Sequence, residues 1–148
     1  MYNIVFPDLE VKNDTLENVL SSKNFNVIYF YPKDNTPGCS IQAKEFTELI
    51  NDFEELNVGV IGVSKDDEQS HKKFIKNKGI NFPLLSDKDF ELHKKYGAYG
   101  EKSIFGKKYM GTMRSVFLVN SKGDIIKSYI NIKATGSGKK VLDFIKNM

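Results

Sequence analysis

Apolar runs and amphipathic stretches alternate along the first half of the chain. Asn26–Tyr31 is β-branched and aromatic, as expected for a buried strand. Val58–Val63 is an unbroken apolar run, as expected for a central strand covered on both faces of a sheet. Between them, apolar residues recur at helical spacing over Ser40–Leu56. A further helix is expected to run to about Lys78, where Gly79 would end it. This half of the chain therefore predicts the order strand, helix, strand, helix.

The second half predicts a different order, in which two strands follow each other directly. Arg114–Val119 and Ile125–Ile130 are joined by a polar turn that contains glycine, which is the pattern of a hairpin. The segment 97–111 contains four glycines and is expected to be a long loop. The remaining expected elements are a short extended segment at Phe82–Leu85 and helices at Asp87–Tyr96 and Lys139–Asn147.

The combined order, β-α-β-α-β-β-α, indicates an α/β protein with a central mixed sheet and helices on both faces. A thioredoxin-like fold matches this order best. A flavodoxin-like sheet matches less well, because the hairpin that begins at Arg114 would interrupt its parallel strands. The length of 148 residues suits one core, so residues 1–148 are predicted to form a single thioredoxin-like domain.

The composition shows no strong bias toward a charged or lipid partner. The 22 lysines and arginines outnumber the 19 acidic residues by three, and the basic residues are scattered along the chain. We therefore expect no nucleic-acid partner, which would require clustered basic residues with interleaved aromatics. No apolar run of about 18 residues is present, so no membrane association is expected. The first residues lack the basic and apolar regions of a signal peptide, which favours a cytoplasmic protein.

Two residues stand out chemically because each occurs once, Cys39 and Arg114. Cys39 follows a predicted strand and lies in the first residues of a predicted helix, whose N-terminus favours negative charge and hence the reactive thiolate. Arg114 begins a later strand that could lie beside the strand before Cys39, where its guanidinium would stabilise a thiolate. Pro32 and Pro37 stiffen the intervening turn, and Thr36 offers a hydroxyl that can donate or accept a hydrogen bond.

The residues around Cys39 also match a known pattern. Pro32-x-x-x-Thr36-x-x-Cys39 resembles the active-site signature of the peroxiredoxins, and the segment 29–39 resembles their bacterioferritin-comigratory, or Q-type, branch. Similar segments follow in the same order through the rest of the chain, including the one that contains Arg114. The resemblance implies a thioredoxin-like fold and a thiol peroxidase that reduces H2O2 and alkyl hydroperoxides to water or alcohols.

The resemblance also implies roles for individual residues. Cys39 would be the peroxidatic nucleophile and would be oxidised to a sulfenic acid. Thr36, Arg114 and the backbone N–H of Cys39 would stabilise the leaving oxygen, and Pro32 would pack over the sulfur and limit the access of water. No metal or other cofactor is implied, because the peroxide bond is weak and the thiolate is a soft nucleophile.

The chain lacks the second redox cysteine that many Q-type relatives have. Many of them carry a resolving cysteine five residues after the peroxidatic one, where this sequence has Lys44, and no other cysteine occurs in the 148 residues. We therefore expect a one-cysteine mechanism. An external thiol such as thioredoxin, glutaredoxin or glutathione would reduce the sulfenic acid, unless it condensed with Cys39 of another subunit. Q-type relatives include both monomers and homodimers, and the sequence leaves both states open.

Two other functions would use the same kind of thiol. A thioredoxin-like disulfide oxidoreductase is disfavoured because the sequence has no Cys-x-x-Cys pair. A non-catalytic redox sensor on the same fold stays open, since an activated cysteine serves either role.

The two histidines are candidates for acid–base catalysis or metal binding. His71 lies in a lysine-rich stretch and His93 in the segment Glu91–Lys95, so both are expected on exposed helix surfaces. Their spacing fits no metal site.

Overall fold

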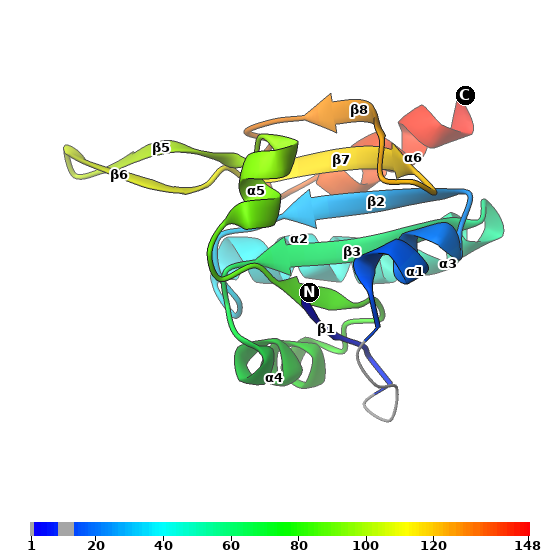
Figure 1. The fold of residues 1–148 in the computed structure, drawn as a ribbon, viewed down its shortest axis with the longest axis horizontal. Coiled ribbons are helices and arrows are strands. Elements are labelled where there is room, and N and C mark those ends of the chain that lie inside the picture. Colours follow the sequence, from blue (N-terminus) through cyan, green and yellow to red (C-terminus); the bar gives the residue numbers. More distant parts are fainter. Residues whose placement is uncertain (1, 9–13) are drawn as a thin grey trace.

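The computed structural model, which describes residues 2–8 and 14–148, is built around a six-stranded mixed sheet of order β1-β4-β3-β2-β7-β8 (Figure 1). β2, β3 and β4 run parallel, whereas β1 is antiparallel to β4, β7 to β2, and β8 to β7. The mixed sheet expected from the sequence is confirmed. The strands are Asn3–Val5 (β1), Phe25–Phe30 (β2), Val58–Ser64 (β3), Leu84–Ser86 (β4), Ser115–Asn120 (β7) and Ile125–Tyr129 (β8).

Strand β2 lies between β3 and β7, and its side chains alternate between the two faces of the sheet. Val27 and Tyr29 belong to the core on one face, whereas Ile28 and Phe30 belong to the core on the other. All four side chains are buried. A strand covered on both faces needs no polar side, which explains the unbroken apolar and aromatic run in the sequence.

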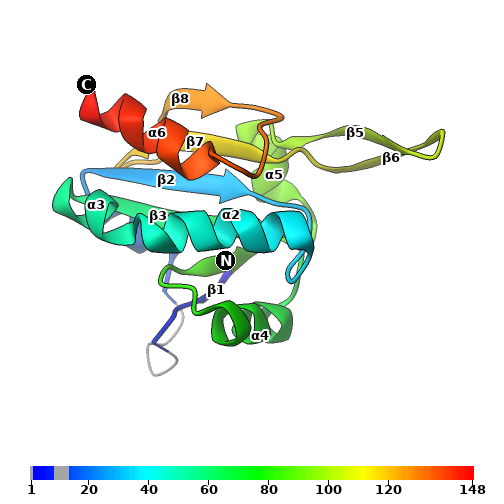
Figure 2. The same ribbon diagram turned by 180° about the vertical axis from the view of Figure 1, so that it is seen from behind.

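Helices cover both faces of the sheet, as Figures 1 and 2 show from opposite sides. Buried side chains of α2, α3, α4 and α6 form one core cluster with the sheet, and those of α1 and α5 form a second cluster on the opposite face. Among the described residues, no helix is long and apolar enough to cross a membrane. The helices are Leu16–Ser21 (α1), Pro37–Glu48 (α2), Ile50–Glu55 (α3), Glu68–Lys78 (α4), Glu91–Tyr96 (α5) and Ser137–Lys146 (α6).

The helical stretch predicted at Ser40–Leu56 starts earlier and is divided in two. α2 begins at Pro37, and Leu49 separates it from α3. Proline is favoured at the first helical position, because its φ is preset and the helix does not need its missing N–H. The earlier start places Cys39 in the first turn of α2.

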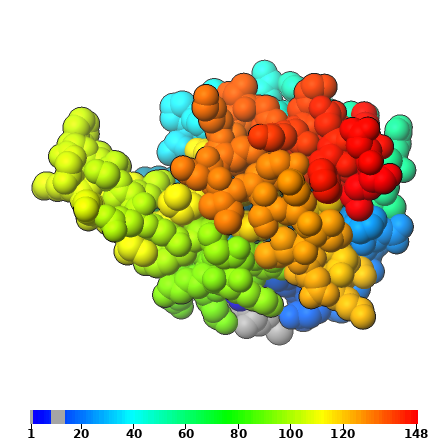
Figure 3. Space-filling model, turned by 90° about the horizontal axis from the view of Figure 1, so that it is seen from above, coloured from blue at the N-terminus to red at the C-terminus, as the bar shows by residue number. Residues whose placement is uncertain are grey.

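The expectation of a long loop at 97–111 is wrong. Tyr99–Ile104 (β5) and Lys107–Thr112 (β6) form an antiparallel ribbon that projects from the body of the molecule (Figures 1 and 3). Phe105 and Gly106 form its two-residue turn, both with positive φ (51° and 80°), a backbone geometry that matches the twist of a hairpin. Most residues of the ribbon are exposed, so its strands lack the apolar alternation that identifies a strand in a sequence.

The expectation that both histidines lie at the surface is also wrong. His71 and His93 are fully buried, and the Nδ1 atom of each lies 2.7 Å from a carboxylate oxygen, of Asp34 and Asp87 respectively. The lysines around them indicate that these helices have an exposed face. The lysines do not show which residues of each helix face the sheet. The structure shows that the two histidines are on the buried side.

Asp87 anchors the start of α5. Its carboxylate accepts hydrogen bonds from the backbone N–H groups of Leu92 (3.1 Å) and His93 (2.8 Å) as well as from the His93 ring. Burial alone would raise the pKa of Asp87, but the hydrogen bonds from His93 and Leu92 outweigh burial and hold the pKa below its usual value. His93 Nε2 in turn lies 2.8 Å from Thr112 Oγ1, which connects α5 to the end of β6.

We expect Asp87→Asn to lower the free energy of unfolding by about 3 kcal/mol at neutral pH, because it removes the charged partner of a buried histidine. A carboxylate whose pKa is lowered by folding contributes stability above its unfolded pKa, and the contribution is lost as the pH falls through the folded pKa. The difference between the two proteins should therefore shrink below about pH 4. Urea denaturation followed by circular dichroism at neutral and acidic pH measures both effects.

The exposed neighbour Asp89 provides the matched control. Asp89→Asn makes the same chemical change outside the buried pair and should leave the unfolding midpoint nearly unchanged. Equal losses in the two variants, or a loss at Asp87 that does not depend on pH, would contradict the prediction.

Candidate active site

The loop after β2 brings Cys39 to the end of the sheet at which the parallel strands β2 and β3 finish. Thr36 is the N-cap residue of α2 and has an extended backbone (φ −87°, ψ 155°). The first helical hydrogen bond runs from Ser40 N to Thr36 O at 2.8 Å. The N–H of Cys39 precedes this bond, so the helix does not use it. The cysteine itself is 1% exposed.

Arg114 reaches the same place from the opposite side of β2. β7 pairs antiparallel with β2 in a register that sets Ser115 opposite Phe30, so Arg114 stands beside the loop that leads to Cys39. The Arg114 Nη2 atom lies 3.4 Å from Cys39 Sγ. The structure thus brings together the two residues that each occur once in the chain. A guanidinium is charged at any working pH, so a permanent positive charge lies next to the sulfur.

Gln42 completes the arrangement, and the sequence reasoning missed it. Arg114 Nη1 donates to Gln42 Oε1 at 2.6 Å, and Gln42 Nε2 donates to Ser137 Oγ at 3.1 Å, which links α2 to the start of α6. Gln42 is fully buried, one helical turn after Cys39. The available signal was a polar side chain next to the apolar face that Ala43 and Phe46 define, since a buried amide requires partners.

The other residues predicted for the site, Thr36 and Pro32, lie in the segment between β2 and Cys39. The Thr36 hydroxyl donates to Lys33 O at 3.1 Å. Gly38 lies against the guanidinium, because a Cβ at this position would stand 3.3 Å from Arg114 Nη2. Pro32 is half-buried and begins the loop, and its packing over the sulfur stays a prediction.

Charges at this site contribute to the pKa shifts of two further side chains, Tyr29 and Lys102. Burial raises the pKa of Tyr29 well above its ordinary value, and negative charge on Cys39 and Asp34 raises it further, while Arg114 opposes the shift. Tyr29 is therefore a neutral phenol. Burial also lowers the pKa of Lys102, on β5, and the positive charge of Arg114 adds to the effect. Lys102 was assigned to a loop from the sequence, so its place beside the site was not foreseen.

The described residues contain no cluster of three or more His, Cys, Asp or Glu side chains that could hold a metal ion. A cavity of about 500 Å3 lies between β1, α1 and α5. Its lining includes neither Cys39 nor Arg114, so it is separate from the candidate active site.

The sequence matches the model of the AhpC/TSA family over residues 3–128, a span that contains Cys39, Thr36 and Arg114. The chain belongs to the AhpC/TSA family. Its relatives identify the branch. A putative peroxiredoxin bcp of Helicobacter pylori strain J99 is 44% identical over 142 residues, which are 93% of this chain and 92% of that protein. The peroxiredoxin Bcp of Bacillus subtilis is 39% identical over 96% of this chain and 92% of its own length. The chain is thus a peroxiredoxin of the Bcp type.

Solved structures of this AhpC/TSA branch share the fold. The bacterioferritin comigratory protein of Xanthomonas campestris, studied for its alkyl peroxide reduction activity, superposes with a TM-score of 0.86 at 32% identity. The alignment covers 99% of this chain and 89% of that one. A cysteine-to-serine mutant of Xylella fastidiosa PrxQ gives a TM-score of 0.87 at 34% identity, over 99% of this chain and 87% of that one. The thioredoxin-like fold expected from the sequence is confirmed.

We expect Gln42→Leu to lower the free energy of unfolding of this peroxiredoxin by about 2 kcal/mol, because it leaves a partly buried guanidinium without one of its acceptors. Chemical denaturation followed by circular dichroism measures the loss. Ser137→Ala is the control, because it removes the other partner of Gln42 and leaves the Arg114 bond in place. It should cost about 1 kcal/mol. Equal losses in the two variants would show that the bond to Arg114 adds no stability.

Proposed function

We propose that this peroxiredoxin reduces H2O2 and alkyl hydroperoxides with Cys39 as the peroxidatic residue and an external thiol as the electron donor. The observation that carries the proposal is the 3.4 Å contact between Arg114 Nη2 and Cys39 Sγ in the first turn of α2. A permanent positive charge and unused N–H groups at the sulfur are what a thiolate nucleophile requires. The alkyl peroxide reduction described for the X. campestris relative supports the substrate class.

The proposed reaction is a displacement at oxygen. The Cys39 thiolate attacks the terminal oxygen of the hydroperoxide, an S–O bond forms as the O–O bond breaks, and the sulfur is oxidised to a sulfenic acid. The other oxygen leaves as hydroxide or alkoxide and takes up a proton to give water or an alcohol. Negative charge therefore moves from sulfur to the leaving oxygen, and donors fixed along that path stabilise the transition state.

Each neighbour of the sulfur has a distinct part in this proposal. Arg114 and the backbone N–H of Cys39 are the donors to the peroxide oxygens. The Thr36 hydroxyl gives its proton to Lys33 O, so its oxygen accepts a hydrogen bond from the O–H of the peroxide and orients it. Pro32 shields the sulfur from water. These positions hold the reactants in a near-attack arrangement.

The return half of the cycle requires a partner. The 148 residues contain no second cysteine, and Lys44, at the position of many resolving cysteines, is exposed on α2. Two external thiols reduce the sulfenic acid to the Cys39 thiol and water and leave as a disulfide. Thioredoxin, glutaredoxin and glutathione are the candidate donors.

We expect reduced protein to consume H2O2 with oxidation of Cys39, and Cys39→Ser to abolish the reaction. Arg114→Gln should lower the second-order rate constant about 100-fold, because it removes a donor to the leaving oxygen. Quenched-flow mixing followed by intact-protein mass spectrometry measures the gain of one oxygen atom.

Lys122→Gln makes the same charge change at an exposed turn and serves as the control. If Arg114→Gln kept the wild-type rate while Lys122→Gln also kept it, Arg114 would have no part in the chemistry. Oxidation of wild-type Cys39 only at the rate of free cysteine would instead favour a redox sensor over a peroxidase.

We expect turnover only when a thiol reductant is added, because no cysteine of the same chain can resolve the sulfenic acid. Protein treated with one equivalent of H2O2 should gain one oxygen atom, bind a sulfenic acid trap such as dimedone, and return to its starting mass with excess thiol. Comparing thioredoxin, glutaredoxin and glutathione as donors identifies the preferred one. Turnover without added thiol would contradict the one-cysteine mechanism. A disulfide-linked dimer that formed at once would show that Cys39 of a second copy is the resolving group.

A further inference from the structure

A buried ion pair fixes the loop that precedes Cys39, and the mechanism above does not use it. Asp34 lies in this loop, two residues after Pro32 and two before Thr36. Its Oδ2 atom is 2.7 Å from Nδ1 of His71, on α4. The two side chains are at most 1% exposed. An ionisable pair this deep is unusual unless each member is fully hydrogen-bonded.

The hydrogen bonds of both residues are complete. Tyr31 donates to Asp34 Oδ1 at 2.5 Å, and Ser70 donates to Asp34 Oδ2 at 2.8 Å. His71 Nε2 lies 3.1 Å from Leu85 O. Because a carbonyl only accepts, Nε2 carries a proton, and a second proton is shared between Nδ1 and the carboxylate. The pair is therefore neutral overall while it joins the loop to α4 and to β4.

The loop backbone is held by a second carboxylate. Asp34 N donates to Asp66 Oδ2 at 2.8 Å, and Ser64 Oγ donates to the same oxygen at 2.8 Å. Asn35, the next residue, adopts a left-handed backbone at φ 60°. A non-glycine residue keeps this conformation only where its surroundings enforce it. The tight turn between Pro32 and Thr36 thus depends on the anchorage of Asp34.

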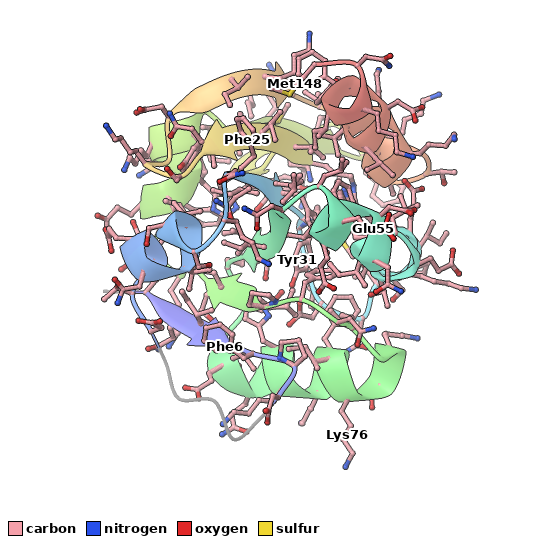
Figure 4. All side chains as sticks on the ribbon, turned by 90° about the vertical axis from the view of Figure 1, so that its right-hand side faces the viewer. Phe6, Phe25, Tyr31, Glu55, Lys76 and Met148 are labelled. Atoms are coloured by element: carbon pink, nitrogen blue, oxygen red, sulfur yellow. The ribbon has the colours of Figure 1, made fainter. Side chains whose placement is uncertain are left out.

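Tyr31 extends the connection toward the site. It is fully buried and lies among the elements in the middle of the view in Figure 4. Its ring centroid is 5.5 Å from that of Tyr29. Tyr29, Tyr31 and Cys39 belong to the same buried core cluster. One continuous set of contacts therefore runs from His71 through Asp34 and Tyr31 to the surroundings of the sulfur.

We propose that Asp34 and His71 are positioning residues that set the Pro32–Cys39 loop in the geometry needed for attack on peroxide. The inference rests on the proposed function of Cys39. Neither residue touches the reacting atoms. They act by fixing the loop whose displacement by about 1 Å is enough to slow an oriented reaction up to 100-fold.

The test compares two reactions of the same sulfur. His71→Gln and Asp34→Asn are measured for the rate of oxidation by H2O2 and for the rate of alkylation by iodoacetamide, both well below the unfolding temperature. Both reactions need the thiolate and access to the sulfur, but only peroxide attack also needs donors preset along the O–O bond. We expect the ratio of the two rates to fall about 10- to 100-fold in each variant. The ratio for the double variant should be no lower than the ratio for His71→Gln, because two amides leave no buried charge without a partner.

Val119→Ala is the control for a loss of stability alone. Val119 is fully buried in β7, paired with Asn26 at the end of the sheet away from Cys39, so its truncation destabilises the fold without reaching the loop. It should keep the wild-type ratio. A wild-type ratio in both pair variants, or the same fall in Val119→Ala, would overturn the inference.

Two smaller changes keep the test decisive if the pair variants do not fold. Tyr31→Phe and Ser70→Ala each remove one donor from Asp34 and should lower the ratio by a few-fold; unchanged ratios in both would overturn the inference. If wild-type Cys39 did not react with H2O2, the proposed function would fail. A faster alkylation of the pair variants would then still show that the loop had been released.

Discussion

The antiparallel pairing of β2 with β7 is the constraint on which the site depends. β2 ends at the end of the sheet where the chain turns toward Cys39, and β7 begins at that same end. A parallel β7 would have started at the opposite end of the sheet, with Arg114 a full strand length from the sulfur. The chain leaves β4 at this end of the sheet and passes through α5 and the β5–β6 ribbon before β7 begins at the same end. Residues 39 and 114, which are 75 positions apart, therefore meet at 3.4 Å.

A buried site made from polar groups has to satisfy each of them. Arg114 is held by Gln42, Gln42 by Ser137, and Ser137 Oγ donates to Ala134 O at 2.9 Å. Removal of one member leaves its neighbour buried without a partner, which costs more than the bond itself contributes. The Tyr29 hydroxyl is an exception among the described residues, since it is buried without a hydrogen-bond partner. Asn26 Oδ1, Thr47 Oγ1 and Ser86 Oγ are the other buried side-chain atoms without a partner among the described residues.

The parts of the fold that depend on local sequence pattern could be predicted from the sequence. The buried strands, the helices on both faces and the thiol at a helix N-terminus all follow from periodicity and turn residues. Gln42 and His71 were not recognised as structural, because their partners lie far away in the chain and a polar residue on a helix is more often exposed. The ribbon of β5 and β6 was taken for a loop for a different reason. It packs against little else, so burial imposed no apolar alternation on it, and only the turn at Phe105-Gly106 marked it.

The burial of Cys39 sets two demands on the loop that oppose each other. Hydrogen peroxide is small and reacts with a sulfur held rigidly among its donors, so the oxidation step favours a fixed loop. The reducing thiol must approach the same sulfur, which is 1% exposed, and a protein thiol cannot do so past an undisturbed loop. The anchorage of Asp34 by His71 and Asp66 therefore has to be strong enough to align the donors and weak enough to release them. A hydrogen-bonded pair that is neutral overall suits that balance better than apolar packing, because water can replace its bonds when the loop opens. In the one-cysteine mechanism proposed for this chain, the reducing thiol comes from outside, so reduction by a protein thiol would depend on that opening in every cycle.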